Sequence, residues 1–262
     1  MNIAVCVKDS PASMEDVAVT EGGQLDDKYL SYNINEWDSS ALEAAVQLKE
    51  EHDGKIHVIN ISPRKNEKLL RKCLARGADE AILIQAEAFE KNDPQTSARI
   101  LADVLKEMDL DIILTGLQSD DIGHSIVGGT LAQLLDLPFA PFVCDIKYDE
   151  DTNKATVKQL LEAGVEREIR IDTPTVLAVE TRIAEPQPPT MMAIRKTEGQ
   201  EIHKRTLQDL DLTEEVVGEK GAETKIKKYK KSPPPEAAEI LEGSPKEVSQ
   251  KIVHILSKKG LR

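Results

Sequence analysis

Short apolar runs alternate with amphipathic segments along the first half of the chain. The runs predict strands at residues 3–7, 56–61, 81–84 and 111–115. The segments between them carry apolar residues three and four positions apart, which is the period of a helix. Pro94 follows Asp93 and predicts a helix start, because proline favours the first helical position. Short apolar strands alternating with helices indicate an α/β fold with a parallel sheet covered on both faces.

The pattern changes after residue 140. Three further strands are predicted at 142–148, 156–161 and 165–171. Apolar and charged residues alternate in the last of them, as in an antiparallel strand with one exposed face. A fourth apolar strand at 175–179 follows. We therefore expect an antiparallel insert within a mostly parallel sheet.

The last quarter of the chain is organised differently. It becomes proline-rich at Glu185 and then strongly charged, and the prolines at 232–236 predict a stiff linker. Ser244, Pro245 and Glu247 form a capping box that predicts a terminal helix with an apolar stripe. That helix could pack on its own domain or dock on a partner subunit. We expect an α/β core at 1–200, a charged segment and linker at 201–236, and a C-terminal arm at 237–262.

Composition excludes several classes of function. The net charge of −13 disfavours nucleic acid as a partner, because binding to phosphate backbones depends on Lys and Arg. The three cysteines are far apart and form no CxxC pair, which argues against disulfides and a zinc site. No run approaches the ~20 apolar residues of a membrane helix, and residues 1–9 lack the pattern of a signal peptide. We expect a cytoplasmic protein without direct membrane insertion.

The stretch at 115–129 has the strongest chemical signal. It joins a strand end, a glycine-containing turn and a helix start, and open parallel sheets place ligands at such positions. It lacks the Lys-Ser or Lys-Thr of a P-loop, and Ser125 has the wrong spacing for a nucleophile elbow. The histidines form no spaced metal cluster. An anion cradle and an ordinary tight connection both remain possible interpretations.

Two more features stand out. Trp37, the only tryptophan, lies at the start of a predicted helix that Asn35, or Ser40 with Glu43, could cap. It could pack in the core or stack on a flat ring. The adjacent Met191 and Met192 follow a proline-rich stretch, which could be a loop folded over the domain edge or a protruding anchor for a partner.

These features, in this order, resemble the beta subunit of electron transfer flavoproteins. The resemblance spans roughly 1–196, with a weaker match at the terminal helix. It is carried by VCVKD, NINEWDSSALEAAVQLKE, CLARGADEAILI, DIILTGLQSDDIGHSIVGGTLAQLLDLP and VEREIRIDTPTVLAVETRIAEPQPPT. It implies a doubly wound sheet of the adenine-nucleotide-binding type with a C-terminal extension helix. It also implies a redox carrier, not an enzyme in itself, in a heterodimer whose alpha subunit holds FAD.

The resemblance also implies sites. The beta subunit of this family binds AMP, or a second FAD in electron-bifurcating members. The matching nucleotide-binding positions are Cys6, Asn35, Asp38, Ile61, Asp121, Gly123, His124, Ser125, Ile126, Val127, Gly128, Gly129 and Thr130. Trp37 would face the flavin of the alpha subunit. The segment at 183–196 would be a recognition loop that docks an acyl-CoA dehydrogenase-type partner through Met191, Met192 and Ile194.

The chain departs from its relatives in the phosphate loop. Many relatives read Asp-Gly-Asp-Thr-Ala-Gln-Val-Gly where this chain has residues 121–128, so an Asp, a Thr and a Gln are replaced here. The departure favours the simple carrier with AMP over a bifurcating subunit with its own FAD. An alternative from another class is a stand-alone nucleotide-binding regulatory protein of the universal stress type. Such proteins are usually shorter and lack the antiparallel insert, the proline-rich loop and the terminal helix.

Overall fold

The chain folds into two compact units, Met1–Lys228 and Tyr229–Arg262. The computed structural model describes residues 1–12, 17–26, 30–63, 67–231, 233, 238 and 240–261. The linker predicted at 232–236 therefore lies almost wholly outside the described residues. No helix within these ranges is both long and apolar enough to cross a membrane.

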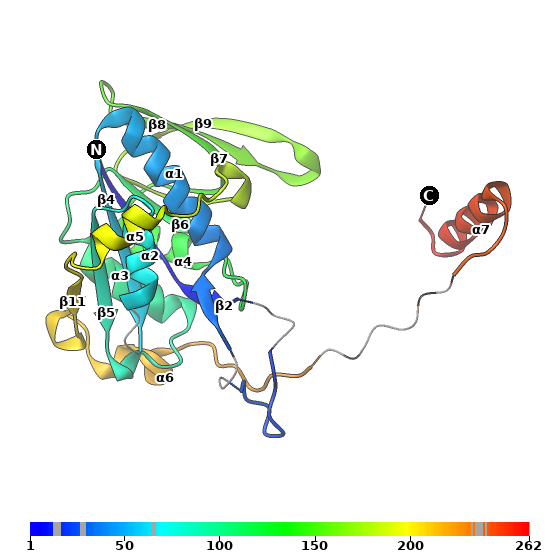
Figure 1. Ribbon diagram of the computed structural model, residues 1–262, viewed down its shortest axis with the longest axis horizontal. Helices are drawn as coiled ribbons and strands as arrows, with labels where there is room; N and C mark the ends of the chain where they lie inside the picture. The colour runs from blue at the N-terminus through cyan, green and yellow to red at the C-terminus, as the bar shows by residue number, and fades with distance from the viewer. Residues whose placement is uncertain are drawn as a thin grey trace. The chain divides into compact units, whose positions relative to one another are not determined.

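The first unit is built on a nine-stranded sheet with the order β11-β5-β4-β1-β6-β10-β7-β8-β9 (Figure 1). Its parallel strands are β1 (Asn2–Cys6), β4 (Lys55–Ser62), β5 (Glu80–Gln85), β6 (Ile112–Gly116), β10 (Thr175–Val179) and β11 (His203–Arg205). β7 (Phe139–Asp149) pairs parallel with β10 and antiparallel with β8 (Lys154–Leu160), which pairs with β9 (Glu166–Asp172). The winding reverses between β1 and β6. The predicted doubly wound, mostly parallel sheet with an antiparallel insert is confirmed.

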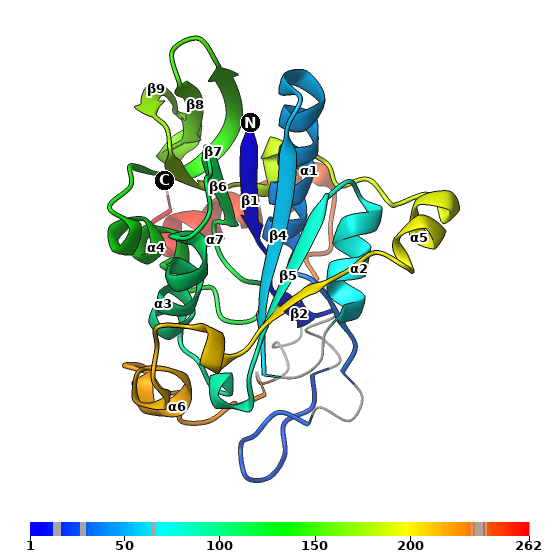
Figure 2. The ribbon, with the colours of Figure 1, turned by 90° about the vertical axis from the view of Figure 1, so that its left-hand side faces the viewer.

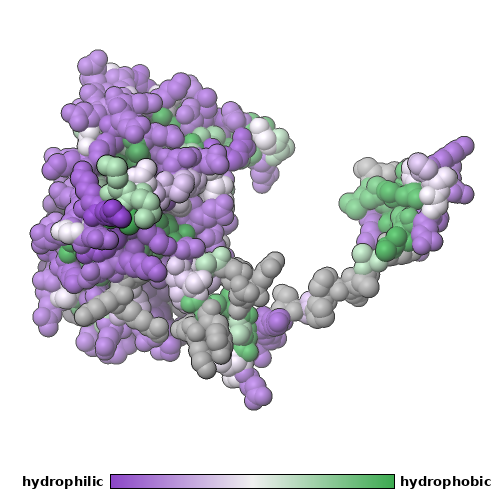
Figure 3. All heavy atoms as spheres, viewed as in Figure 1, coloured by the Kyte–Doolittle hydropathy of each residue, from purple (hydrophilic) through white to green (hydrophobic). Residues whose placement is uncertain are grey.

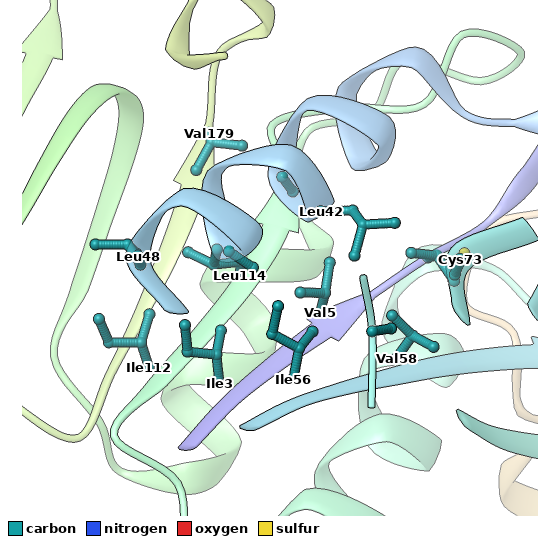
Figure 4. Packing of buried hydrophobic residues seen from close by; sticks show 14 of the residues in the cluster. Ile3, Val5, Leu42, Leu48, Ile56, Val58, Cys73, Ile112, Leu114 and Val179 are labelled. Atoms are coloured by element: carbon teal, nitrogen blue, oxygen red, sulfur yellow. The ribbon is translucent and has the colours of Figure 1, made fainter. Parts of the chain in front are cut away.

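Helices cover both faces of the sheet (Figure 2). α1 (Glu36–His52) and α2 (Glu67–Ala75) pack on one face, and α3 (Pro94–Leu105) and α4 (Val127–Leu135) pack on the other. Side chains alternate along a strand, so Ile3 and Val5 face α1 while Cys6 faces α3 and α4. Both cores are dominated by aliphatic side chains, as Figure 4 shows for the α1 face, because aromatic residues make up only 3% of the sequence.

Several short elements complete the first unit. β2 (Asp9–Pro11) and β3 (Tyr32–Ile34) form a two-stranded antiparallel sheet, and β11 extends the main sheet. The remaining short helices are η2 (Glu87–Phe89), η3 (Glu162–Gly164), η4 (Thr181–Ile183), α5 (Met191–Thr197), η5 (Leu207–Asp209), η6 (Glu214–Val216) and α6 (Gly218–Gly221). These elements are short and mostly polar, so contacts with neighbouring elements rather than their own composition define them.

The first unit extends beyond the predicted boundary at residue 200. β11 pairs with β5, and Val217 is only 1% exposed within the core on the α3 side. Charged residues dominate the sequence around Val217. The few apolar positions that pack against the core therefore form no recognisable pattern. The charged segment up to Lys228 therefore belongs to the folded core.

The second unit contains α7 (Pro245–Lys258), which is the predicted terminal helix. The capping box is confirmed: Ser244 Oγ accepts a hydrogen bond from Glu247 N at 3.4 Å, and Glu247 Oε2 accepts one from Ser244 N at 2.8 Å. Ile252, Ile255 and Leu256 on its apolar stripe are exposed, and Figure 3 shows apolar residues gathered on this helix.

Candidate functional site

A cavity of about 300 Å³ opens at the carboxyl ends of β1, β4 and β6. Ligands of open α/β sheets bind where the strand order reverses, and here it reverses between β1 and β6. Apolar side chains form much of the wall: Val7, Ile59, Ile61, Phe89, Leu101 and Ile122. The position and the lining are those of a small-molecule site.

The cavity brings together eight of the expected nucleotide-binding residues. Those that line it are Cys6, Asn35, Asp38, Ile61, His124, Ser125, Ile126 and Val127. The others lie on the same loop and helix without lining it: Asp121, Gly123, Gly128, Gly129 and Thr130. Trp37 is half-buried on the first turn of α1 and also lies outside the lining.

The loop before α4 is a turn with two residues in the left-handed region. Gly123 has φ +65° and Ser125 has φ +57°. Gly123 N donates to Ser119 O at 2.9 Å, and Ser125 Oγ donates to Gln118 Oε1 at 3.3 Å. The N-cap residue Ile126 has no side-chain cap among the described residues. The first-turn amides of α4 are therefore available to an anion.

Gly128 has a packing role in this arrangement. A Cβ at this position would lie 2.8 Å from Thr115 Oγ1 and 3.2 Å from Phe139. The glycine therefore lets the first turn of α4 lie directly against β6 and β7.

Asn35 holds two loops together at the cavity mouth. Its Nδ2 donates to Gln118 O and its Oδ1 accepts from Asp120 N, both at 2.9 Å. The predicted capping of α1 by the Asn35 side chain is wrong, because that amide is committed to the loop after β6. The carboxylate of Asp120 accepts from Glu36 N at 3.0 Å instead, and Ser40 lies inside the helix, not at its start.

Asp38 ties the ends of β1 and β6 together. Its carboxylate accepts hydrogen bonds from Lys8 N at 2.8 Å and from Gly116 N at 3.0 Å. Burial raises the pKa of Asp38 to about 7, although these hydrogen bonds oppose the shift. A Cβ at Gly116 would collide with Asp38 Oδ1 and the Cβ of Trp37, so the glycine lets α1 approach β6.

The floor of the cavity is polar but uncharged. Cys6 and Thr115 are register partners on β1 and β6. Burial, with the nearby Asp38 carboxylate, raises the pKa of the Cys6 thiol far above its usual range, so the thiol stays neutral. The buried Oγ1 of Thr115 has no hydrogen-bond partner in the described part of the chain. A buried polar atom in that state is a candidate for a ligand contact.

Lys8 was not predicted as a site residue, although it lies two residues after the end of β1. It lines the cavity, and its Nζ lies 2.7 Å from both carboxylate oxygens of Asp121. The ion pair thus joins the residues after β1 to the loop before α4. The two residues are 113 positions apart, so local sequence patterns could not reveal the pair.

The wall of the cavity at the start of α3 is supported by the charged segment. The predicted helix start at Pro94 is confirmed, and Asp93 caps α3 by accepting from Thr96 N at 2.8 Å. Its second oxygen accepts from the backbone of Glu223 at 2.9 Å and of Thr224 at 3.0 Å. Asn92 Oδ1 accepts from Gly218 N at 2.7 Å. Residues 218–224 therefore hold this wall in place, which the sequence did not indicate.

The expected recognition loop contains the short helix α5. Thr190 caps it by accepting from Ala193 N at 3.2 Å. Met191 and Met192 are 69% and 83% exposed, and Ile194 is also exposed. Arg71 of α2 donates to Thr197 O at 2.7 Å and fixes the end of the helix. The segment therefore presents apolar side chains on a supported turn.

Known proteins resemble this chain over nearly its whole length. Residues 22–210 match the electron transfer flavoprotein domain. The chain is 32% identical to an electron transfer flavoprotein subunit beta of Methylophilus methylotrophus over 98% of each chain. It is also 32% identical to the subunit beta of Bacillus subtilis, over 98% of this chain and 97% of that protein. A caffeyl-CoA reductase-Etf complex subunit CarD of Acetobacterium woodii is 30% identical over 99% of each chain.

Proposed function

Because the chain belongs to the family of electron transfer flavoprotein beta subunits, we propose that it is the electron-carrier subunit of a heterodimer with an alpha subunit. FAD held mainly by the alpha subunit would supply the redox chemistry, accepting electrons from a dehydrogenase and passing them on. The chain itself would bind a structural nucleotide and dock the partner. Similarity over nearly the whole chain carries the proposal.

We propose AMP as the nucleotide in the cavity. The apolar wall suits a flat base, and the uncapped amides at the start of α4 suit a phosphate. The base would lie near Cys6, Asn35, Asp38 and Ile61, with the unpartnered hydroxyl of Thr115 beside it. The phosphate would lie against 121–130. Asn35 and Asp38 would act by holding the loops, because their polar atoms are already hydrogen-bonded.

A bifurcating beta subunit with its own FAD is the second candidate. The sequence of the phosphate loop favours AMP, because Gly123, His124 and Ile126 replace polar residues of the bifurcating pattern. A loop with fewer side-chain donors is better suited to one phosphate than to the two of FAD. The universal stress alternative gains no support, since the similarity to beta subunits extends over both units of the chain.

The docking roles rest on exposure. Met191, Met192 and Ile194 present apolar surface on α5, and adaptable thioethers suit a partner surface. We assign this segment to docking an acyl-CoA dehydrogenase-type partner. Trp37, half-buried next to Gly116, is assigned to the face that meets the flavin of the alpha subunit.

The experiment is to co-express the chain with the alpha subunit of its source and analyse the purified complex. We expect a yellow heterodimer with one FAD and one extractable AMP. Two FAD molecules and no AMP would support the bifurcating candidate. A colourless mixture of chains that never associates would contradict the proposal, and a lone chain that binds ATP would support the universal stress alternative.

A further inference from the structure

We propose that the Lys8–Asp121 ion pair determines which ligands the nucleotide site selects. In this proposal Lys8 binds the phosphate of the ligand, and Asp121 competes with that phosphate for Lys8. The site then discriminates against nucleosides that lack a phosphate. The inference rests on the proposed nucleotide-binding function and adds two residues with opposite effects on it.

The geometry leaves only the side chain of Lys8 free to move. Its backbone N donates to Asp38 at 2.8 Å and its carbonyl accepts from Asn35 N at 2.8 Å. Its Nζ reaches across the cavity mouth to the two carboxylate oxygens of Asp121, each at 2.7 Å. Asp121 begins the expected phosphate loop, so the ion pair holds the ammonium group at the start of that loop.

The surrounding charges make Lys8 the cation that faces the expected phosphate loop. Among the described residues that line the cavity, the other basic side chains are Lys91 and His124. Lys91 lies in the segment before α3 and pairs with Glu219 at 2.8 Å. Asp120, next to Asp121, is held by the backbone N of Glu36 at 3.0 Å and adds negative charge. An incoming phosphate therefore meets acidic groups unless Lys8 turns toward it.

The strength of the pair permits this exchange. The side chains of Lys8 and Asp121 are 41% and 23% exposed, and ion pairs with this access to water contribute little to stability. A terminal phosphate carries a charge of about −1.5 to −2 at pH 7, whereas Asp121 carries a single charge. A phosphate on the amides of α4 can therefore displace Asp121 from Lys8, and a nucleoside cannot.

The test uses the full chain in complex with the alpha subunit, freed of bound nucleotide by dialysis. Isothermal titration is done with AMP and with adenosine as probes. Lys8→Met should weaken AMP binding roughly tenfold, the effect of losing a charge-assisted hydrogen bond, and leave adenosine binding unchanged. Asp121→Asn should strengthen AMP binding roughly three- to tenfold, because the competing charge is removed. In the double variant the gain from Asp121→Asn should shrink, because the two residues act on one contact.

Lys106→Met is the matched control. It breaks the ion pair with Asp211, 3.0 Å long and outside the cavity, and should leave the binding of both probes unchanged. Weaker AMP binding by Asp121→Asn would overturn the proposal, because Asp121 would then help to hold the ligand. AMP binding that is indifferent to both substitutions would overturn this proposal alone. A wild-type complex that binds neither probe would overturn the proposed nucleotide site as well.

Discussion

Asp38 shows how one buried carboxylate organises the site. It accepts backbone hydrogen bonds from the ends of two strands and is buried, so its charge has a desolvation cost. Its pKa of about 7 in the folded chain lies above the usual Asp value of about 3.9. The folded state therefore holds a proton on Asp38 at pH values where the unfolded chain has lost it.

This difference predicts a pH dependence of stability. Because the pKa of Asp38 is raised in the folded state, this residue contributes stability to the fold that is fully present below about pH 4. The contribution is lost as the pH rises through about 7. The contribution of Asp38 should therefore fall by about 2–3 kcal/mol between pH 5 and pH 8. The measurement is the free energy of unfolding in urea at both pH values, for the wild type and Asp38→Asn. The decrease should be smaller in Asp38→Asn, and equal decreases would show that Asp38 does not titrate in this range.

Some residues at the cavity could be predicted from the sequence, and others could not. Asn35, Asp38 and the glycine-containing turn were predicted from local patterns and a family resemblance, and most of them line the cavity. Lys8 was missed, and Thr115 was included only as the first residue of the stretch at 115–129, because the significance of both depends on contacts far along the chain. A lysine after a strand is ordinary until Asp121 is found beside it. Residue type and spacing thus locate a site, but long-range pairing assigns the roles.

At the scale of elements, the close approach of α1 to the sheet depends on Gly116. The glycine ends β6, and the first turn of α1 lies against it. No other residue type leaves room for Asp38 and the Cβ of Trp37. The helix start, the strand end and the cavity mouth therefore form one packed unit.

Gly116→Ala tests this packing. The added methyl group would collide with Asp38 and Trp37, so the free energy of unfolding should fall by about 1–3 kcal/mol, as for other overpacked sites. Thermal or urea unfolding measures the change. Gly199→Ala is the control, because a Cβ there meets nothing within 4 Å. Similar stability of both variants would show that α1 can shift at little cost.

Asp93 links another pair of elements, the start of α3 and residues 223–224. Asp93→Ala removes a helix cap, worth about 1 kcal/mol, and leaves the backbone amides of Glu223 and Thr224 unpaired. We expect a loss of about 2–3 kcal/mol in total and faster tryptic cleavage near Lys220. Asp209→Ala, which removes a cap at the exposed η5, should leave cleavage near Lys220 unchanged. Unchanged cleavage in Asp93→Ala would mean that other contacts hold the segment.

The sequence predicted the long apolar elements well and the short polar ones poorly. β10 has the predicted bounds, and β1, β4, β5 and β6 differ from them by one residue at one or both ends. These strands are buried on both faces, so their own side chains specify them. β2, β3 and β11 have three residues each, and all three residues of β11 are exposed. Strands this short depend on the hydrogen bonds that a neighbouring strand offers.

At the scale of the whole molecule, each of the two units has an exposed apolar surface among its described residues. One is α5 with Met191 and Met192, and the other is the stripe of α7 with Ile252 and Leu256. Exposed apolar groups of this kind mark interaction sites. The domain boundary was placed too early from the sequence, since charge content alone separated the segment after residue 200 from the core.

The α5 surface predicts a defect in partner docking without a defect in folding. Met192→Asp should lower kcat/KM for electron transfer from the dehydrogenase at least tenfold, because it places a charge in an apolar contact. The melting temperature and the flavin content of the heterodimer should not change. Glu198→Gln, at the end of the same helix, serves as a control of the surface charge. Normal electron transfer by Met192→Asp would exclude α5 from the docking surface.

The α7 stripe predicts a defect in assembly. Ile252→Asp should weaken association with the alpha subunit at least tenfold if the stripe is buried there, as measured by analytical ultracentrifugation. Gln250→Asp, on the opposite side of the helix by its spacing, should leave association unchanged. Equal association of both variants would show that α7 does not contribute to the interface.

The covalent link between α7 and the first unit has a consequence for how such a heterodimer would come apart. Once the first unit has bound the alpha subunit, docking of α7 is an intramolecular step with an effective concentration in the millimolar range for a short linker. A helix that would bind only weakly as a free peptide can then stay bound. Release would proceed in stages, and a helix that detaches would return faster than the subunits could separate.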